Sequence, residues 1–356
     1  MKGESRSVIV VGAGIVGLTS AYRLARRGHH VTLIDPRPGR GATWAAAGMI
    51  APSAEILPGE QETYRLQLGA LPAWRGLVED LEELTGIRVG VYETGTLYVG
   101  WEPGDRALLR QFTEVADSFA APFRHSHRID EPALFSGLSD RVNDGVVLAG
   151  DAWVDPDEAV RVLREALSRL DVELVTESVV EVSGDERSVI AHTPSRRVSA
   201  DTGLLTTGCS ALPLGSHASG LNLVRPVRGV TVRVQGLETT DSAMVRAFVR
   251  GHPFYLVNRS GGRGVLGASS EERSAAAVEV GELHRILRDA LELVPSLESA
   301  EILETRVGLR PASPTGRPFF ERLEPKGWGW SSGYYRHGVT LAPWAADLAV
   351  AFVEEL

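Results

Sequence analysis

The stretch Ser7-Val8-Ile9-Val10-Val11-Gly12-Ala13-Gly14-Ile15-Val16-Gly17 decides the fold of this chain. Residues 8–11 are apolar and β-branched, which predicts a buried parallel strand. After the glycines, apolar residues recur at helical spacing as far as Gly28, which is typical of a helix end. A second apolar strand, residues 30–34, then ends in Asp35. The order strand, glycine-rich turn, helix, strand and acid predicts a Rossmann-like unit.

Each glycine of the turn has a distinct physical role. Gly12 permits the tight turn, Gly14 lets a pyrophosphate approach the backbone, and Gly17 lets the helix lie close to the strand. The free amides at the helix N-terminus then face the phosphates, and Asp35 accepts hydrogen bonds from the ribose hydroxyls. An acid at this position disfavours a 2′-phosphate and therefore NADP. The motif alone predicts dinucleotide binding and leaves FAD and NAD both open.

The composition excludes several classes of function. The 356 residues carry a formal net charge of -9, which leaves no electrostatic footprint for nucleic acid or for an acidic membrane. Cys209 is the only cysteine, which excludes an internal disulfide and a cysteine-built metal site and fits a reducing cytosol. No HExxH motif occurs, and no apolar stretch reaches the ~20 residues of a membrane span. We expect a cytoplasmic protein without a signal peptide, a metal site, or a nucleic-acid or membrane partner.

The spacing of apolar residues changes several times along the chain, which predicts two interleaved domains. The helical period marks residues 66–84, 156–170, 281–293 and 339–356, and Asp155-Pro156 is a typical helix start. The strand period marks a hairpin over 88–99, strands at 172–175, 178–182 and 203–208, and further strands between 223 and 268. We expect the strands between 172 and 208 to rejoin the first sheet, and a ligand to bind between the two domains.

Two arginines and a tyrosine are candidates for substrate binding. Arg310 and Arg336 both lie in apolar, glycine-rich surroundings. A guanidinium shielded from water needs a planar anionic partner, and a substrate carboxylate supplies a bidentate match. An internal salt bridge or a surface position is the alternative for each arginine. Tyr255, in an apolar strand, offers its hydroxyl to the same carboxylate or is an ordinary core tyrosine.

A run of small, uncharged residues, 42–52, follows the first unit. It allows a large flat ligand to lie against the backbone, although a closely packed helix start explains the same pattern. Together with this run, four other segments resemble the glycine oxidase branch of the D-amino acid oxidase superfamily, flavoenzymes linked to thiamine biosynthesis. The four segments are Gly12-Ala13-Gly14-Ile15-Val16-Gly17, Phe254-Tyr255-Leu256-Val257, Gly308-Leu309-Arg310-Pro311 and Gly333-Tyr334-Tyr335-Arg336-His337-Gly338.

The resemblance covers nearly the whole chain and implies FAD rather than NAD as the cofactor. It implies an α/β fold of mixed α+β character, in which a Rossmann-like FAD-binding domain is interleaved with an antiparallel-sheet substrate domain. Residues 1–85, 150–220 and 305–356 would form the FAD-binding domain, and residues 86–149 and 221–304 the substrate domain.

The resemblance also implies a role for individual residues. Gly12, Gly14 and Gly17, with Ile15 and Val16 between them, would hold the pyrophosphate, and Asp35 the adenosine ribose. Arg310 and Tyr255 would bind the substrate carboxylate, with Arg336 nearby, and these three form the expected catalytic set. Further cofactor contacts are expected at Thr43, Ala46, Ala47, Gly48, Met49, Val179, Gly333, Arg336, His337, Gly338 and Val339.

The reaction implied is oxidation of glycine or an N-substituted glycine by hydride transfer to flavin N5, with O2 as the second substrate. The products would be glyoxylate, ammonia or an amine, and hydrogen peroxide, and a homo-oligomer is implied by relatives only. The chain departs from the family pattern at 273–277, at 316–320 and at Tyr334-Tyr335-Arg336-His337, where His-Tyr-Arg-Asn is common. An oxidase of a bulky N-carboxymethyl amino acid and a D-amino acid oxidase are therefore alternatives. An NAD-dependent dehydrogenase and a flavin-binding protein without amine chemistry are alternatives from other classes.

Overall fold

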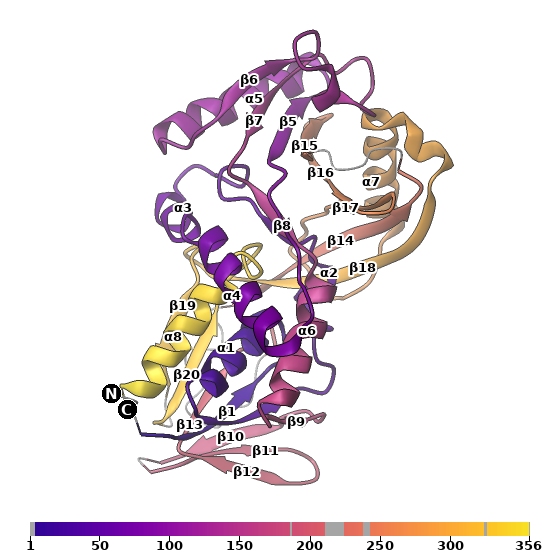
Figure 1. Cartoon of the computed structure of the whole chain (residues 1–356). Coiled ribbons are helices and arrows are strands. Elements are labelled where there is room, and N and C mark those ends of the chain that lie inside the picture. The colour runs from indigo at the N-terminus through magenta and orange to yellow at the C-terminus, as the bar shows by residue number, and fades with distance from the viewer. Residues whose placement is uncertain (1–3, 186, 211–223, 238–242, 324–325, 356) are drawn as a thin grey trace.

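A computed structural model describes residues 4–185, 187–210, 224–237, 243–323 and 326–355. The polypeptide forms two regions, each built around one large sheet, which lie one above the other in Figure 1. The described part of the chain contains no helix that is long and apolar enough to cross a membrane.

The lower region is built on a mostly parallel sheet with the strand order β19-β20-β13-β1-β2-β9. Only β19 runs antiparallel to its neighbour. The strands are β1 (Ser7–Val11), β2 (His30–Ile34), β9 (Glu173–Val175), β13 (Thr202–Leu205), β19 (Phe319–Arg322) and β20 (Trp328–Ser332). The predicted strand–turn–helix–strand unit is confirmed, and the predicted strands at 172–175 and 203–208 do rejoin this sheet.

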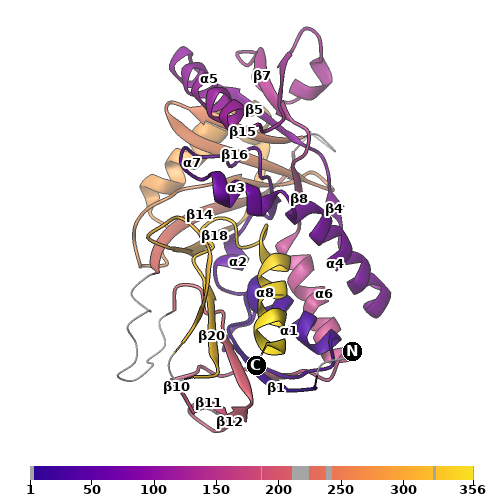
Figure 2. The ribbon, with the colours of Figure 1, turned by 90° about the vertical axis from the view of Figure 1, so that its left-hand side faces the viewer.

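Helices cover one face of the parallel sheet and a small meander covers the other, which makes three layers (Figures 1 and 2). Val8 and Val10 of β1 pack against the helices, whereas Ile9 and Val11 pack toward the meander, because alternate residues of a strand point to opposite faces. The helices are α1 (Ile15–Arg26), α4 (Ala70–Thr85), α6 (Pro156–Arg169) and α8 (Ala342–Glu354). The meander comprises β10 (Glu181–Gly184), β11 (Val189–His192) and β12 (Arg197–Ala200). The expectation that the strand at 178–182 joins the parallel sheet is wrong, because β10 pairs only with β11.

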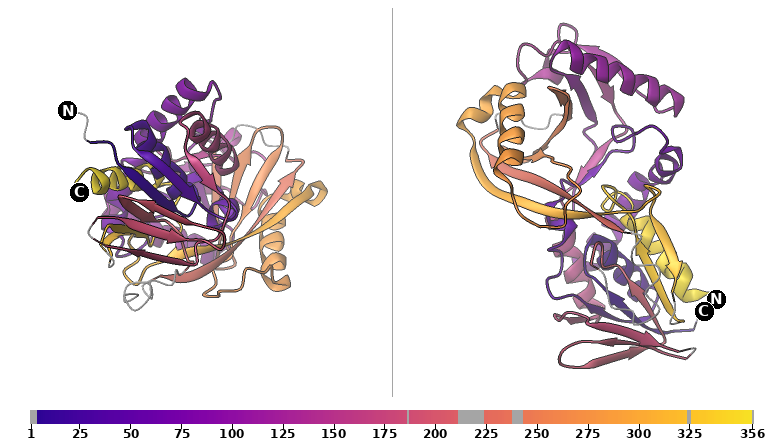
Figure 3. Two further views of the ribbon diagram at one scale, coloured as in Figure 1. Left: turned by 90° about the horizontal axis from the view of Figure 1, so that it is seen from below. Right: turned by 180° about the vertical axis from the view of Figure 1, so that it is seen from behind.

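The upper region is built on a large sheet with the order β18-β14-β17-β16-β15-β5-β7-β6. Its pairs are antiparallel, as predicted, except for β5 and β15, which run parallel. The strands are β5 (Thr96–Gly100), β6 (Arg124–His127), β7 (Asp144–Leu148), β14 (Arg225–Gln235), β15 (Met244–Val249), β16 (His252–Arg259), β17 (Arg263–Gly267) and β18 (Glu301–Ala312). Helix α5 (Pro103–Ser118) packs on one face and α7 (Val280–Leu293) on the other, as Figure 3 shows from behind.

Short elements complete the described structure, some between the two regions and some within the upper one. They are α2 (Ala42–Ala45), β3 (Met49–Ile50), α3 (Gln61–Gln67), β4 (Val91–Tyr92), β8 (Ala152–Val154) and two 3-10 helices, η1 (Pro132–Phe135) and η4 (Pro295–Ser299). The predicted hairpin over 88–99 is wrong, since β4 pairs with β8 while β5 pairs with β15 and β7. Every residue of β5 is buried, so this strand belongs inside the large sheet and not in an exposed hairpin. The single helix predicted over 66–84 is interrupted at Gly69, which caps α4.

Candidate active site

The glycine-rich turn between β1 and α1 leaves no room for side chains. Gly12 has a φ of +101°, and a Cβ there would lie 2.6 Å from the carbonyl oxygen of Thr206. A Cβ on Gly17 would overlap the carbonyl oxygen of Gly12. Gly14 is the N-cap of α1 and supplies no capping side chain. Because the N-cap residue has no side chain, it leaves the positive end of α1 open on its side, which suits a phosphate.

Asp35 follows β2 and stabilises the same turn. Its Oδ2 accepts a hydrogen bond from the amide of Ala13 at 2.7 Å, and its Oδ1 accepts one from the amide of Arg37 at 2.7 Å. Each carboxylate oxygen still has a lone pair free for another donor. The Thr43 hydroxyl accepts from the amide of Ile15 at 3.0 Å and joins the small-residue segment to α1.

A cavity of about 830 Å³ extends from this turn to the large sheet. Most of the site residues predicted from the sequence line it. They are Gly12, Gly14, Ile15, Val16, Asp35, Thr43, Ala46, Ala47, Gly48, Met49, Val179, Tyr255, Arg310, Arg336, Gly338 and Val339. Segments that are far apart in the chain, from Gly12 to Val339, thus meet around one cavity.

Three predicted cofactor contacts do not line the cavity. Gly17 packs against Gly12 behind the turn, and Gly333, with a φ of +78°, packs beside the ring of Phe319. His337 is buried, and its Nδ1 lies 3.2 Å from Oε2 of Glu55. The signal that grouped these residues was sequence adjacency, but neighbours in a turn point in different directions.

Arg310 has the environment of an anion-binding residue. It lies on β18, and its Nη1 donates to the carbonyl oxygens of Ser269 at 3.1 Å and Arg228 at 3.4 Å. No carboxylate of the described residues forms an ion pair with it. The guanidinium lies over Gly229, where a Cβ would overlap it. A cation in a cavity, held by carbonyl oxygens and without a carboxylate, is suited to bind a carboxylate ligand.

Tyr255 lies on β16 and also lines the cavity. Its ring packs over Gly267, where a Cβ would overlap the ring and the hydroxyl. Burial raises the pKa of Tyr255, and the positive charge of Arg310 acts in the opposite direction. The hydroxyl therefore stays protonated at neutral pH and can donate a hydrogen bond to the ligand that Arg310 binds.

Arg336 differs from Arg310 because it is held in internal ion pairs. Its Nη2 lies 3.0 Å from Oε2 of Glu60 and donates to the carbonyl oxygen of Glu55 at 2.7 Å, and its Nε lies 3.7 Å from Oε2 of Glu55. The internal salt bridge, one of the two alternatives that the sequence left open, therefore describes Arg336. It borders the cavity but has less freedom to bind a substrate carboxylate than Arg310.

Glu55 is the centre of a charged cluster that the sequence analysis missed. Arg246 of β15 pairs with it at 3.0 Å. Burial disfavours its charge, but the hydrogen bond from His337 and the charges of Arg246 and Arg336 outweigh burial and hold the pKa of Glu55 well below its usual range. The sequence offered one signal for this cluster, which is that Glu55 is an acid among the small residues that follow Pro52. Its partners come from elements far away in the chain, so only the tertiary structure reveals the cluster.

Asp151 lies next to this cluster, is fully buried, and accepts a hydrogen bond from the amide of Ser53 at 3.2 Å. Burial raises the pKa of Asp151, whereas hydrogen bonds from Thr96 and Ser53 and the charge of Arg246 lower it. The effect of burial is larger, and the resulting pKa is about 7. Because the folded pKa is above the unfolded value of 3.8, this group contributes stability below about pH 4 that is lost as the pH rises to about 7.

We expect Asp151→Asn to remove the loss of folding stability that ionisation of Asp151 causes as the pH rises. The variant should match the wild type near pH 4 and exceed its free energy of unfolding above pH 7, by at most roughly 4 kcal/mol. Unfolding curves of the two proteins between pH 4.5 and 8.5 measure the difference, with exposed Asp347→Asn as the control. An identical pH dependence for Asp151→Asn and wild type would contradict the assignment.

The backbone from Trp44 to Gly48 has a one-sided pattern of hydrogen bonds. The carbonyl oxygens of Trp44, Ala45, Ala46 and Ala47 accept from side chains of the large sheet. Among the described residues, the amides of Ala47 and Gly48 donate to no partner. Both residues line the cavity, so the two amides are available to a ligand there.

Comparison with known proteins identifies the class. The pattern of the DAO family, FAD dependent oxidoreductases, matches residues 7–352, and the chain belongs to this family. The chain is an FAD-dependent oxidoreductase, so FAD and not NAD is its cofactor.

Within this family, the chain is similar to one sequence relative and to two solved structures. The chain is 28% identical to a glycine oxidase of Geobacillus kaustophilus, over 98% of this chain and 92% of the relative. It is similar to the crystal structure of glycine oxidase from Geobacillus kaustophilus, with a TM-score of 0.87, 26% identity, and coverage of 99% and 95% of the two chains. It is also similar to the crystal structure of iminodiacetate oxidase from Chelativorans sp. BNC1, with a TM-score of 0.82, 27% identity, and coverage of 97% and 95%. The resemblance to the glycine oxidase branch and the D-amino acid oxidase-like fold are confirmed.

The residues present fit FAD. The turn at Gly12 leaves space for a pyrophosphate at the N-terminus of α1, and Asp35 stands at the end of β2. The small residues Ala46, Ala47 and Gly48 suit a flat ring, and the amides of Ala47 and Gly48, which donate to no partner among the described residues, suit its hydrogen-bond acceptors. When bound, FAD supplies a two-electron acceptor for the substrate and passes the electrons on to an oxidant.

Proposed function

We propose that this protein oxidises glycine or an N-substituted glycine with O2, forming glyoxylate, ammonia or an amine, and hydrogen peroxide. The observation that carries the proposal is Arg310, a cation without a carboxylate partner among the described residues, that lines the same cavity as the Ala46–Gly48 backbone. The names of its relatives, glycine oxidase and iminodiacetate oxidase, support the same substrate class.

The side chains act through orientation. Arg310 binds the substrate carboxylate in a bidentate manner, and the Tyr255 hydroxyl donates to one of its oxygens. Two fixed points at the carboxylate restrict the rotation of the α-carbon and hold its hydrogen toward the flavin site, where N5 would accept a hydride.

No side chain is assigned as the proton acceptor. The acids that line the cavity among the described residues are Asp35 and Glu55. Asp35 already accepts hydrogen bonds from two backbone amides, and Glu55 forms an ion pair with Arg246, so neither is assigned as the base. A substrate amine that binds in its neutral form supplies its own lone pair, so the reaction needs no base from the protein.

A second candidate substrate is a glycine with a bulky N-substituent, as in an N-carboxymethyl amino acid. The cavity wall opposite the parallel sheet includes Leu108, Phe112 and Val115 of α5 and Phe248 of β15. Apolar walls of this size favour a substrate larger than glycine. The divergent residues Arg273 and Phe319 do not explain the larger space. Arg273 is exposed and pairs with Glu279, and Phe319 packs on Trp330, so neither lines the cavity.

The visible spectrum of the holoenzyme without oxygen tests the proposal. Addition of glycine, sarcosine, an N-alkylglycine series or D-alanine should bleach the flavin bands of the purified protein, and the concentration at half effect ranks the substrates. Bleaching by N-alkylglycines at lower concentration than by glycine would assign the second candidate. A yellow protein that no amine bleaches would contradict both, and preferential bleaching by D-alanine would assign a D-amino acid oxidase.

We also propose the division into an FAD-binding domain (1–85, 150–220 and 305–356) and a substrate domain (86–149 and 221–304). The strand membership of the two large sheets supports it, although β18 extends across the boundary at 305. Location in the cytoplasm and assembly into a homo-oligomer remain proposals that fractionation and light scattering would test.

A further inference from the structure

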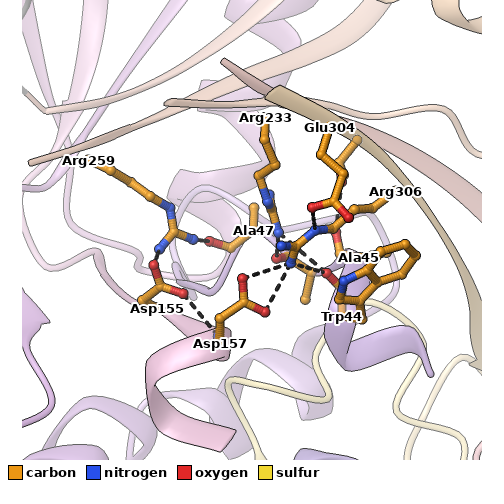
Figure 4. Close-up of polar contacts among 11 residues, drawn as sticks. Trp44, Ala45, Ala47, Asp155, Asp157, Arg233, Arg259, Glu304 and Arg306 are labelled. Carbon is orange, nitrogen blue, oxygen red and sulfur yellow. Dashed lines mark hydrogen bonds and ion pairs between the residues drawn. The ribbon is translucent and has the colours of Figure 1, made fainter. Parts of the chain in front are cut away.

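Three arginines of the large sheet converge on the backbone of residues 44–47, as Figure 4 shows. Arg233 lies on β14, Arg259 ends β16, and Arg306 lies on β18. Nη2 of Arg233 donates to the carbonyl oxygens of Ala46 at 2.9 Å and Trp44 at 3.4 Å. Nη2 of Arg259 donates to Ala47 at 2.9 Å, and Nη1 of Arg306 to Trp44 at 2.8 Å. The hydroxyl of Thr231 completes the set by donating to Ala45 at 3.0 Å.

Two of these arginines are neutralised and one is not. Arg259 pairs with Asp155, and Arg306 pairs with Asp157 at 2.8 Å and Glu304 at 2.7 Å. Arg233 forms no ion pair with any carboxylate of the described residues, and its buried Nη1 has no hydrogen-bond partner among them. Burial, with the nearby charges of Arg259 and Arg306, lowers the pKa of Arg233 to about 10, so it is still a cation at neutral pH.

Arg233 therefore costs stability where it stands. Its side chain is about nine-tenths buried, and an unpaired buried cation is unfavourable for folding. A methionine of similar length would fill the space without that cost. We therefore look for a role of Arg233 other than stabilising the fold.

The planar trans peptide connects this cation to the cavity. In a trans peptide the C=O and the following N–H point in opposite directions. The carbonyl oxygens of Ala46 and Ala47 point to Arg233 and Arg259, so the amides of Ala47 and Gly48 point away from the arginines. A cation bound to the carbonyl also polarises the peptide and strengthens its N–H as a donor.

We propose that Arg233 is a positioning residue for the flavin: bound to the Ala46 carbonyl, it directs the Ala47 amide at the ring and favours its reduced, electron-rich form. The inference rests on the proposed placement of the flavin against Ala46–Gly48. Arg233 acts through the peptide and contacts neither the cofactor nor the substrate directly. Arg259 and Arg306 hold the same segment but, being paired with acids, contribute less charge.

The reduction potential of the bound flavin tests this inference without any amine substrate. Arg233→Met should bind FAD but shift the equilibrium between oxidised and two-electron-reduced flavin about tenfold toward the oxidised form, the size expected for one charge ~10 Å away at an effective dielectric of about 20. For a two-electron couple this is a potential lower by about 30 mV. Reduction by dithionite against a redox dye measures it.

Two variants make the test specific. Arg233→Lys keeps the charge and should stay within a factor of three of the wild-type equilibrium. Arg263→Met removes an exposed arginine from the neighbouring strand β17 and should change nothing. Loss of FAD from folded Arg233→Met that Arg233→Lys restores would also support the role. An unchanged potential in FAD-loaded Arg233→Met, or equal effects of methionine and lysine, would overturn it. Either of these results leaves the proposed amine oxidation intact, since that is tested by bleaching of the wild type.

Discussion

Arg310→Ala is expected to lower kcat/KM for glycine or its N-substituted derivative by about 10²–10³-fold. The reason is that the carboxylate loses a charge-assisted, bidentate partner, an interaction whose removal costs about 2–5 kcal/mol in sites shielded from water. If the arginine orients the α-carbon as well as binding the carboxylate, kcat falls together with the rise in KM. Steady-state oxygen consumption over a range of substrate concentrations separates the two effects.

Two comparisons accompany this prediction. Arg310→Lys keeps the charge without the fork geometry and should recover only part of the activity. The flavin spectrum of Arg310→Ala should match the wild type, because among the described residues Arg310 donates to the carbonyl oxygens of Ser269 and Arg228 alone. Near wild-type kcat/KM in Arg310→Ala would remove this residue from the substrate site and leave Arg336 as the remaining candidate.

Gly17→Ala is expected to abolish FAD binding. The added Cβ would overlap the carbonyl oxygen of Gly12, and because that oxygen belongs to the backbone, no side-chain movement can relieve the contact. Helix α1 would have to move away from β1, which displaces the amides that face the pyrophosphate and strains the core around Leu18. We expect less than a tenth of the wild-type FAD content and a lower melting temperature. The ratio of flavin to protein absorbance and a thermal unfolding curve measure both.

Gly76→Ala is the matched control for this change. Gly76 lies inside α4, and a Cβ there meets nothing within 4 Å. Alanine is the better helix former, so this variant should be neutral or more stable by roughly 0.5–1 kcal/mol. Full FAD content in Gly17→Ala would show that the turn tolerates a side chain, and would contradict the tight packing described above.

Much of the nucleotide-binding half could be predicted because its determinants are local. Gly12, Gly14 and Gly17 lie within six consecutive residues, and the strand and helix beside them follow from the spacing of apolar residues. The helix start at Asp155 could be predicted for the same reason, and Asp155 does cap α6, since its side chain accepts a hydrogen bond from the amide of Asp157. Predictions failed where pairing is not local. The hairpin predicted over 88–99 is in fact two strands of different sheets, because β5 pairs with β15 and β7 while β4 pairs with β8.

The candidate site shows the same division. The sequence alone determined a dinucleotide-binding turn, an acid after the second strand, and two arginines in apolar surroundings, since each of these is a property of a few consecutive residues. Only the tertiary structure decided that Arg336 is paired with Glu55 and Glu60, while Arg310 has no carboxylate partner among the described residues. It alone placed Arg233 behind the Ala46 carbonyl. The physical reason is that the state of a buried charge depends on which groups surround it, and here these groups come from strands and loops up to hundreds of residues away in the chain.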